Sequence, residues 1–349
     1  MQRMNRTLKT VVILMTILTA GCCRLMAQGD SISLRPSFSL TYKTEVQTDF
    51  TDSRWHNELE AIINIPLSRK FTFSIGGLSH YTDDETPLVD DIQIFSNIEC
   101  WDEKFALMLA GFTWQINDRH SLFAGVRRYD EDYFCSEDIS LFTNSSCGGF
   151  PTLTYNYYVP TFPFAAMGLH YKYDYKDITF QASLYNGLSY NKLTGHANVF
   201  RFCPKTDGTY FMSQLEYRFE DSHYYFGGSL YYGDKLIDDE PYSLRPTLWT
   251  YAEQYVLPNL CLLGAYSHAF SKDDLCYNFI GVGARYILGP AEFGVFTDYT
   301  RVEDIPERAT EFTCKLNITD WLSVQPVFHL IHTDQDTYHV GMMRLNVEL

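Results

Sequence analysis

Residues 210–219 read YFMSQLEYRF, and they show most clearly the pattern that predicts the fold. The odd-numbered residues of this stretch are mostly apolar, whereas the even-numbered ones include Gln214, Glu216 and Arg218. Because successive side chains of a β-strand point to opposite faces, this stretch predicts a strand with one apolar and one polar face. Such alternation over about ten residues is typical of a strand in a transmembrane β-barrel.

The same alternation recurs along the chain. It is found in residues 32–42, 59–67 and 343–349. A single alternating segment is weak evidence, but repeated segments of this length favour a barrel. After residue 27 there is no helical stripe and no change of composition that would mark a linker. The sequence therefore predicts one all-β domain over residues 28–349, a transmembrane antiparallel β-barrel.

The connections predict the number of strands. Outer-membrane barrels have short periplasmic turns and longer external loops. If residues 92–100 formed a strand, the long connection 130–162 would lie in the periplasm, so we assign them to a loop. This gives sixteen strands, with fourteen and eighteen as alternatives. The expected long external loops are 81–103, 130–162 and 187–207, and the expected short turns are 67–69, 117–119, 174–176, 220–223, 258–259, 288–290 and 319–320.

The N-terminus has the layout of a secretory signal peptide. Arg3, Arg6 and Lys9 precede the apolar stretch 11–21, and a cleavage site follows Ala27. The apolar stretch is too short for a membrane-spanning helix, so we expect residues 1–27 to be removed. The alternative is cleavage before Cys22, as in a lipoprotein.

Composition narrows the class of protein. The formal net charge is −16 and becomes −20 without residues 1–27, which hold four basic and no acidic residues. An acidic chain of this kind is not expected to bind nucleic acid. Aromatic residues make up 16% of the sequence, as expected for a barrel whose aromatic side chains form girdles at the membrane interfaces. We therefore expect the chain in the bacterial outer membrane, in contact with its lipids.

Charged residues of the alternating segments are expected to face the lumen. A basic side chain facing lipid at the membrane midplane would cost about 2–4 kcal/mol. Basic and acidic residues on an inner wall can order water that polar solutes replace, which favours an open pore. The alternative is a plugged interior in which these charges pair with one another. The candidate residues for the pore lining and its constriction are Arg127, Asp130, Glu131, Asp132, Glu216, Arg218, Arg285, Lys315 and Arg344.

The longest connection, 130–162, is a candidate for the constriction. Its glycines and prolines allow sharp bends, so it could fold inward and bring its acidic residues 130–132 opposite Arg127 and Arg285. The alternative is an exposed loop with a solvated acidic cluster. Four aromatic residues could stack on sugar rings: Tyr210, Trp249, Tyr251 and Tyr255. For Trp249 and its alternates, the residues on the same face of its strand, we favour a place in the aromatic girdle instead.

Several segments resemble a known family. Residues 131–134 (EDYF), 141–148 (LFTNSSCG), 163–170 (PFAAMGLH), 184–187 (LYNG) and 320–326 (DWLSVQP) are similar, in the same order, to segments of the carbohydrate-selective porins of the OprB type. The similarity runs with gaps from about Asn117 to the C-terminus, and segments 141–148 and 320–326 are the most specific. The resemblance implies a sixteen-stranded outer-membrane channel whose long loops constrict the pore and favour sugars.

The sequence thus predicts a porin for passive diffusion of small hydrophilic solutes, with carbohydrates implied by the resemblance and a homotrimer left open. The alternatives are a closed structural or adhesive barrel and, less favoured, a hydrolase using Ser145 or Ser146 with His170 or His329. No nucleophile elbow, zinc-protease motif or phosphate loop is present, so we expect no catalytic residue, metal or cofactor. Cys135 and Cys147 lie in one loop and could form a disulfide.

Overall fold

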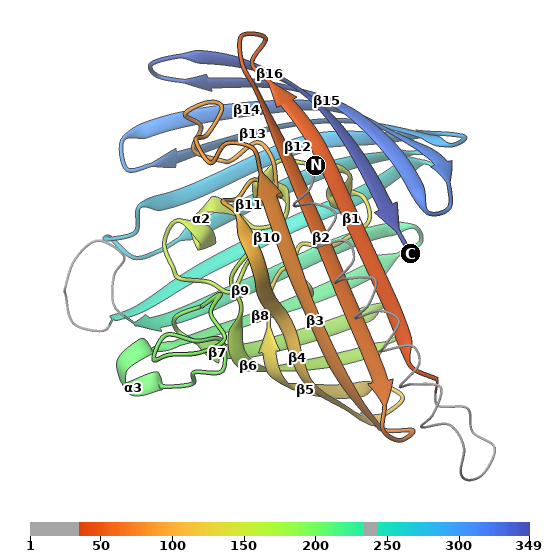
Figure 1. Ribbon diagram of the computed structural model, residues 1–349, viewed down its shortest axis with the longest axis vertical. Helices are drawn as coiled ribbons and strands as arrows, with labels where there is room; N and C mark the ends of the chain where they lie inside the picture. Colours follow the sequence, from red (N-terminus) through yellow and green to blue (C-terminus); the bar gives the residue numbers. More distant parts are fainter. Residues whose placement is uncertain (1–34, 234–242) are drawn as a thin grey trace, which may run out of the picture.

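The computed structural model describes residues 35–233 and 243–349, which form a closed antiparallel barrel of sixteen strands (Figure 1). The predicted fold class and strand number are confirmed. The expected signal peptide, 1–27, and most of the connection 234–245 lie outside the described residues. The strands are β1 (Ser37–Thr48), β2 (Ser53–Pro66), β3 (Phe71–Thr82), β4 (Glu103–Asn117), β5 (His120–Arg127), β6 (Ala166–Tyr175), β7 (Ile178–Asn186), β8 (Thr209–Phe219), β9 (Ser222–Gly233), β10 (Ser243–Leu257), β11 (Leu260–Ala269), β12 (Cys276–Leu288), β13 (Ala291–Val302), β14 (Ile305–Thr319), β15 (Leu322–Thr333) and β16 (Thr337–Glu348).

The barrel closes where the first strand meets the last. β1 and β16 are antiparallel, with Thr41 opposite Glu348 and Thr48 opposite Gly341. Backbone hydrogen bonds join Leu40 and Leu349 in both directions, at 2.9 and 2.8 Å. A closed ring leaves no unpaired strand edge, which is the condition for a sheet in lipid.

Short turns join the strands at one rim of the barrel. They lie at 67–70, 118–119, 176–177, 220–221, 258–259, 289–290 and 320–321, where the sequence predicts them. Left-handed backbone at Lys176, Glu220 and Gly289, with φ of 54, 54 and 59°, allows such tight reversals. Both ends of the barrel sequence lie at this short-turn rim, and the long connections lie at the other, the loop rim.

The two faces of the wall differ as the alternation predicts. On β8, Phe211, Leu215 and Phe219 are exposed on the outside of the barrel, whereas Gln214 points inward and is buried. Apolar side chains are exposed in the same way on the outside of the other strands, for example Ile280 on β12. This gives the barrel an apolar outer surface suited to lipid. Within residues 35–233 and 243–349, none of the helices has the length and apolar character needed to cross a membrane.

Two of the three long connections enter the barrel. The connection 128–165 carries the short helix α2 (Pro151–Thr154), and Figure 1 shows α2 within the ring of strands. The connection 83–102 also reaches inward, because Phe95 is buried against Ile331 of β15. The sequence predicts an external loop there, and the structure corrects this. Residues 92–100 form no strand, as expected.

The third long connection, 187–208, packs on the outside of the barrel. Its Val199 is buried with Leu107, Val126 and Ala165. This connection carries the short helix α3 (Pro204–Asp207), which Figure 1 shows at the loop rim. The lumen is therefore occupied only by the connections 83–102 and 128–165 among the segments that the structure describes.

Candidate functional site

The connection 128–165, called the long loop below, is tied at its base to the wall. The guanidinium of Arg127, the last residue of β5, donates two hydrogen bonds of 2.5 Å to the carboxylate of Asp132. A two-point contact between guanidinium and carboxylate fixes orientation as well as distance. The backbone N–H of Tyr129 donates to the carbonyl of Pro160 at 2.7 Å, which joins the start of the loop to its end. Its middle reaches across the barrel, where α2 contacts β11 and β12.

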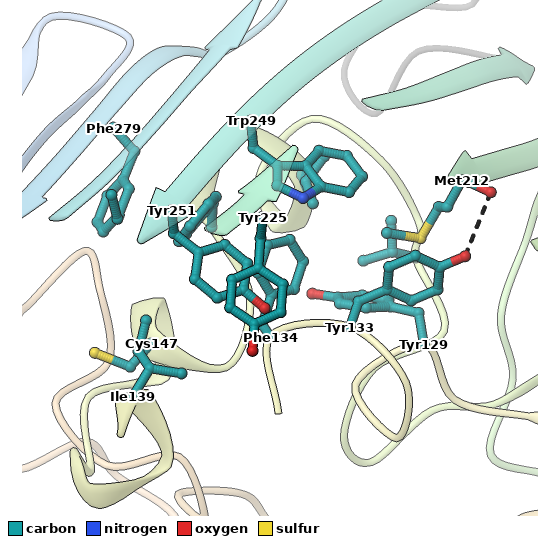
Figure 2. Close-up of a cluster of buried hydrophobic side chains, with 14 of the residues drawn as sticks. Tyr129, Tyr133, Phe134, Ile139, Cys147, Met212, Tyr225, Trp249, Tyr251 and Phe279 are labelled. Atoms are coloured by element: carbon teal, nitrogen blue, oxygen red, sulfur yellow. Dashed lines mark hydrogen bonds between the residues drawn. The ribbon is translucent and has the colours of Figure 1, made fainter. Parts of the chain in front are cut away.

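Aromatic packing holds the long loop against one side of the lumen (Figure 2). The ring of Phe134 lies 5.4 Å from that of Trp249 and 5.8 Å from that of Tyr251. The ring of Phe150 lies 4.8 Å from that of Phe279 on β12. Each aromatic pair contributes about 0.5–1.5 kcal/mol beyond the burial of its area. These contacts fill the lumen on the side of β10 to β12.

Carboxylates of the wall bind backbone N–H groups of the long loop. Glu311 on β14 accepts hydrogen bonds from the N–H groups of Thr143 and Asn144, each at 3.0 Å. Glu253 on β10 accepts one from the N–H of Ile139 at 3.2 Å. Hydrogen bonds to a charged group contribute about 1.5–3 kcal/mol each. The inward position of the loop therefore depends on acidic residues of the wall.

The connection 83–102, called the second loop below, is anchored in the same way. Glu307 on β14 accepts hydrogen bonds from the N–H groups of Ile92 and Gln93, at 2.5 and 3.0 Å. The side-chain amide of Gln93 donates to Asp298 on β13 at 2.8 Å. The second loop thus crosses the lumen and reaches the far wall.

The two inward loops also bind each other. The N–H of Ser145 donates to the carbonyl of Ile94 at 3.0 Å, and the N–H of Asn97 donates to the carbonyl of Thr143 at 2.7 Å. The hydroxyl of Ser146 donates to the side chain of Gln93 at 2.9 Å. Backbone and side-chain bonds of this kind make one connected body from two loops.

A cavity of about 460 Å³ remains between the two loops and the wall formed by β1, β2 and β14 to β16. Its volume lies in the range of small-molecule sites, which is about 300–1,000 Å³. The cavity reaches from Ile94 of the second loop to Glu348 at the short-turn end of β16. Its charged lining residues are Lys43, Glu58, Glu60, Glu99, Arg128, Asp130, Lys315, Arg344 and Glu348.

Most of these charges are paired across short distances. Lys43 lies 2.8 Å from Glu58 on the neighbouring strand. Arg128 lies 3.1 Å from Glu60 and 3.2 Å from Asp130. The paired charges leave a wall rich in hydrogen-bond donors and acceptors but without a large excess of either sign.

Two acidic residues of the loops have raised pKa values. Burial raises the pKa of Asp130 to about 6, even though the Arg128 guanidinium favours its charged form. Burial, with the nearby negative charge of Glu45, raises the pKa of Glu99 to about 7. Both carboxyl groups line the cavity, so the charge of the cavity changes near neutral pH.

No family model and no curated protein matches the sequence. Among solved structures, OprB of Pseudomonas putida at high pH is similar with a TM-score of 0.75 and 14% identity, over 90% of this chain and 94% of that chain. OmpT of Vibrio cholerae without loop L8 gives 0.61 and 9%, over 90% and 99%. An anion-selective porin from Comamonas acidovorans gives 0.61 and 10%, over 90% and 99%.

The chain has the fold of the outer-membrane porins. The two loops that enter the lumen divide the interior of this barrel. At 14% identity or less, the likeness concerns the fold, and the solute is addressed below as a proposal.

The structure brings several predicted site residues together at the base of the long loop. Arg127 binds Asp132, and Arg128 lies 2.5 Å from Glu131. Lys315 and Arg344 line the cavity from the opposite strands. The predicted set therefore includes both the loop base and the wall that it approaches.

The other three predicted residues lie elsewhere. Arg285 was expected opposite residues 130–132, and this is wrong, because it binds Asp138 at 2.7 Å and Glu292 at 2.6 Å. It therefore holds a later part of the long loop. Glu216 and Arg218 lie 3.2 Å apart near the short-turn rim.

A second cavity of about 160 Å³ lies between the long loop and strands β6 to β10. Its lining includes Lys172, Gln214 and Glu216 of the wall. Cys135 of the loop lines both cavities and is exposed. This thiol therefore marks the point where the two cavities approach each other.

The predicted girdle position of Trp249 and its alternates is wrong. Tyr210, Trp249 and Tyr251 point inward and are buried. The long loop covers them, so they are not surfaces for a solute either. Tyr255 is partly buried, and its hydroxyl donates to Asp138 at 3.0 Å. Their function is to hold the loop.

The predicted pore-lining set does not include six charged lining residues of the cavity: Lys43, Glu58, Glu60, Glu99, Arg128 and Glu348. The first three stand at inward positions of alternating strands, so periodicity contained the signal. Arg128 follows inward-facing Arg127 and would point outward if β5 continued. The strand ends at Arg127, and the side chain of Arg128 turns into the lumen instead.

The proposed serine and histidine pairs of a hydrolase do not form among the residues that the structure describes. The hydroxyl of Ser146 donates to Gln93, and that of Ser145 to the carbonyl of Ser96. His170 contacts Ser183 at 2.8 Å, and His329 contacts Thr143 at 3.1 Å. The disulfide left open between Cys135 and Cys147 does not form, since both thiols are free.

Proposed function

We propose that the protein is an outer-membrane porin through which small hydrophilic solutes, carbohydrates above all, diffuse passively. The observation that carries this proposal is the cavity of about 460 Å³ between the inward loops and the charged wall. A solute that crosses the barrel along β1, β2 and β16 would meet polar side chains on one side and the two loops on the other. Pore width and lining then decide which solutes pass.

The outer surface and the fold support a place in the bacterial outer membrane. The outward side chains are apolar on strand after strand, and lipid is the partner that such a surface requires. The similar solved structures are outer-membrane proteins, among them OprB and OmpT. The loop rim would then face the cell exterior, and the short-turn rim would face the periplasm.

The lining of the cavity supports carbohydrate as the solute class. Sugar hydroxyls need donors and acceptors close together, and the wall offers ammonium and carboxylate in Lys43 and Glu58 and side-chain amides in Gln325 and Asn346. Paired charges of both signs do not create the strong single-sign field that would favour ions. The resemblance of segments 141–148 and 320–326 to carbohydrate-selective porins agrees with this assignment.

We also propose a homotrimer. OmpT, an outer membrane protein of Vibrio cholerae solved in a trimer form, is similar to this chain with a TM-score of 0.60 and 9% identity. Trimers would use part of the apolar outer wall as the interface. The mass of the detergent-solubilised protein, measured by light scattering with correction for detergent, tests this: a single-chain mass contradicts it.

Liposome swelling tests the porin proposal. The refolded protein is reconstituted into liposomes, which are placed in isotonic sugars of increasing size. We expect fast swelling in monosaccharides and slower swelling as the sugar grows. Liposomes that hold folded protein yet stay tight to every sugar would contradict the porin and support a closed structural or adhesive barrel.

A further inference from the structure

The backbone of Ile94 has an unusual conformation. Its φ is +53°, in the left-handed region that glycine adopts freely and asparagine tolerates. For a β-branched residue this is a genuine outlier, because the branched side chain crowds the backbone. Such a conformation costs free energy and persists only where the surroundings impose it.

The side chain of Ile94 is exposed although it is apolar. It lines the cavity and is 43% exposed. Other apolar lining residues are half-buried or buried, including Ile92, Phe134 and Phe142. Among the described lining residues, Ile94 is the large apolar side chain that the cavity leaves uncovered. Burial therefore does not explain why an isoleucine stands here.

The surroundings hold Ile94 firmly in place. Its carbonyl accepts a hydrogen bond from the N–H of Ser145 at 3.0 Å. On one side, Gln93 is bound through its N–H to Glu307 at 3.0 Å. On the other, the N–H of Phe95 donates to Asp91 at 2.7 Å, and the ring of Phe95 is buried. Anchored neighbours on both sides force the side chain of Ile94 to project where it does.

We propose that Ile94 sets the size limit of the passage. Strain in a protein backbone concentrates where function requires a fixed geometry. Here the strained residue is a rigid, branched side chain with few rotamers, and it stands at the edge of the cavity that a solute must cross. This inference rests on the proposed porin function, and it assigns the limiting contact to one residue of the second loop.

Three substitutions separate bulk from backbone strain. Ile94→Gly removes both, and Ile94→Ala removes most of the bulk but keeps a side chain in the left-handed region. Ile94→Asn keeps as many side-chain non-hydrogen atoms as isoleucine, although it fills less volume, and it suits the left-handed region. Ile280→Ala, on the outer face of β12 where Ile280 is 50% exposed, is the matched control. Heat-modifiable migration in gels shows that each variant is folded.

The measurement is the ratio of disaccharide to monosaccharide swelling rates in liposomes. We expect Ile94→Gly and Ile94→Ala to raise this ratio by about twofold or more, because a wider passage relaxes the size limit. Ile94→Asn and Ile280→Ala should keep the wild-type ratio. Wild-type uptake with an unchanged ratio in folded Gly and Ala variants overturns this inference alone. Wild-type liposomes that stay tight overturn the proposed function and the inference with it.

Discussion

The carboxylate of Glu45 on β1 accepts a hydrogen bond from the guanidinium of Arg344 on β16 at 2.7 Å, across the seam where the barrel closes. The two residues stand directly opposite each other in the register. The hydroxyl of Ser96 in the second loop donates to the same carboxylate at 2.5 Å. This pair therefore links the seam of the barrel to a loop in its lumen.

We predict that Arg344→Met destabilises the barrel by about 3–5 kcal/mol, because it leaves the buried carboxylate of Glu45 without its cation. Glu45→Gln combined with Arg344→Met should recover much of this loss, since no buried charge then remains. Urea unfolding, followed by heat-modifiable migration in gels, measures both. A cost below about 1 kcal/mol for the single variant, the size expected for an exposed pair, would contradict this assignment.

The second prediction concerns the anchor of the long loop at Glu311. Glu311→Gln replaces a charged acceptor of the Thr143 and Asn144 N–H groups by a neutral one. We expect a loss of about 1–3 kcal/mol in the free energy of unfolding and larger current fluctuations in planar bilayers as the loop loosens. Asp118→Asn removes the same charge at an exposed turn and should behave as wild type. Equal behaviour of the two variants would refute the anchoring function.

The third prediction is a change of ion preference with pH. Asp130 and Glu99 have pKa values raised to about 6 and about 7, so both lose their negative charge as the pH falls through this range. The cavity then becomes less negative and should favour anions more. Reversal potentials in a KCl gradient, measured between about pH 8 and about pH 5, should shift toward chloride selectivity as the pH falls.

The double variant Asp130→Asn, Glu99→Gln is the control for this titration. It should show little shift over the same range, and a shift as large as in wild type would assign the titration to other groups.

The free energy of unfolding should also depend on the protonation of Asp130 and Glu99. Because the folded pKa values lie above those of an unfolded chain, the charged forms disfavour folding, and this penalty disappears as the pH falls toward about 4.

The fourth prediction uses the thiol of Cys135, which lines both cavities. Within the described part of the chain it is the exposed cysteine, whereas the others are buried or half-buried. Water-soluble maleimides should therefore label it first and lower the single-channel conductance. The thiol is open to the cavities but lies inside the barrel, where partial desolvation and the negative charges of Asp132 and Glu131 raise its pKa to about 11. Labelling should therefore quicken as the pH rises. The conductance of Cys135→Ser should not respond to the maleimide. If it falls as in the wild type, Cys135 is not the site through which the reagent acts.

The strands and turns were predictable because their signals are local. Alternation fixes which side of the wall a residue such as Gln214 occupies, and turn residues such as Gly289 mark each reversal. These signals do not depend on what fills the barrel. The strand number followed from them once residues 92–100 were assigned to a loop.

The contents of the lumen were harder to predict, because they depend on the path of the long loop. Nothing in the local sequence indicates that Arg285 binds Asp138 rather than residues 130–132, since Arg285 lies far from the whole long loop in sequence. The side on which Trp249 lies was readable, because it shares the parity of inward-facing Glu253. A general preference of tryptophan for membrane interfaces led to the wrong assignment.

In the proposed function, solutes pass through the cavity between the inward loops and the wall, and Gly148 offers a direct test. Gly148 lines this cavity, its φ is −97°, and an added Cβ would meet its nearest neighbour, the Ser145 carbonyl oxygen, at 3.7 Å. A larger side chain is therefore compatible with the backbone and can extend into the cavity. Gly264, on the outer face of β11, also has open space for a Cβ.

The decisive measurement compares sugar uptake by liposomes containing wild type, Gly148→Trp and Gly264→Trp, with folding verified by heat-modifiable migration. Gly148→Trp should slow the uptake of monosaccharides by about tenfold, because the indole fills much of the passage. Gly264→Trp should leave uptake unchanged. Equal uptake by all three folded proteins would show that solutes do not cross the barrel through this cavity.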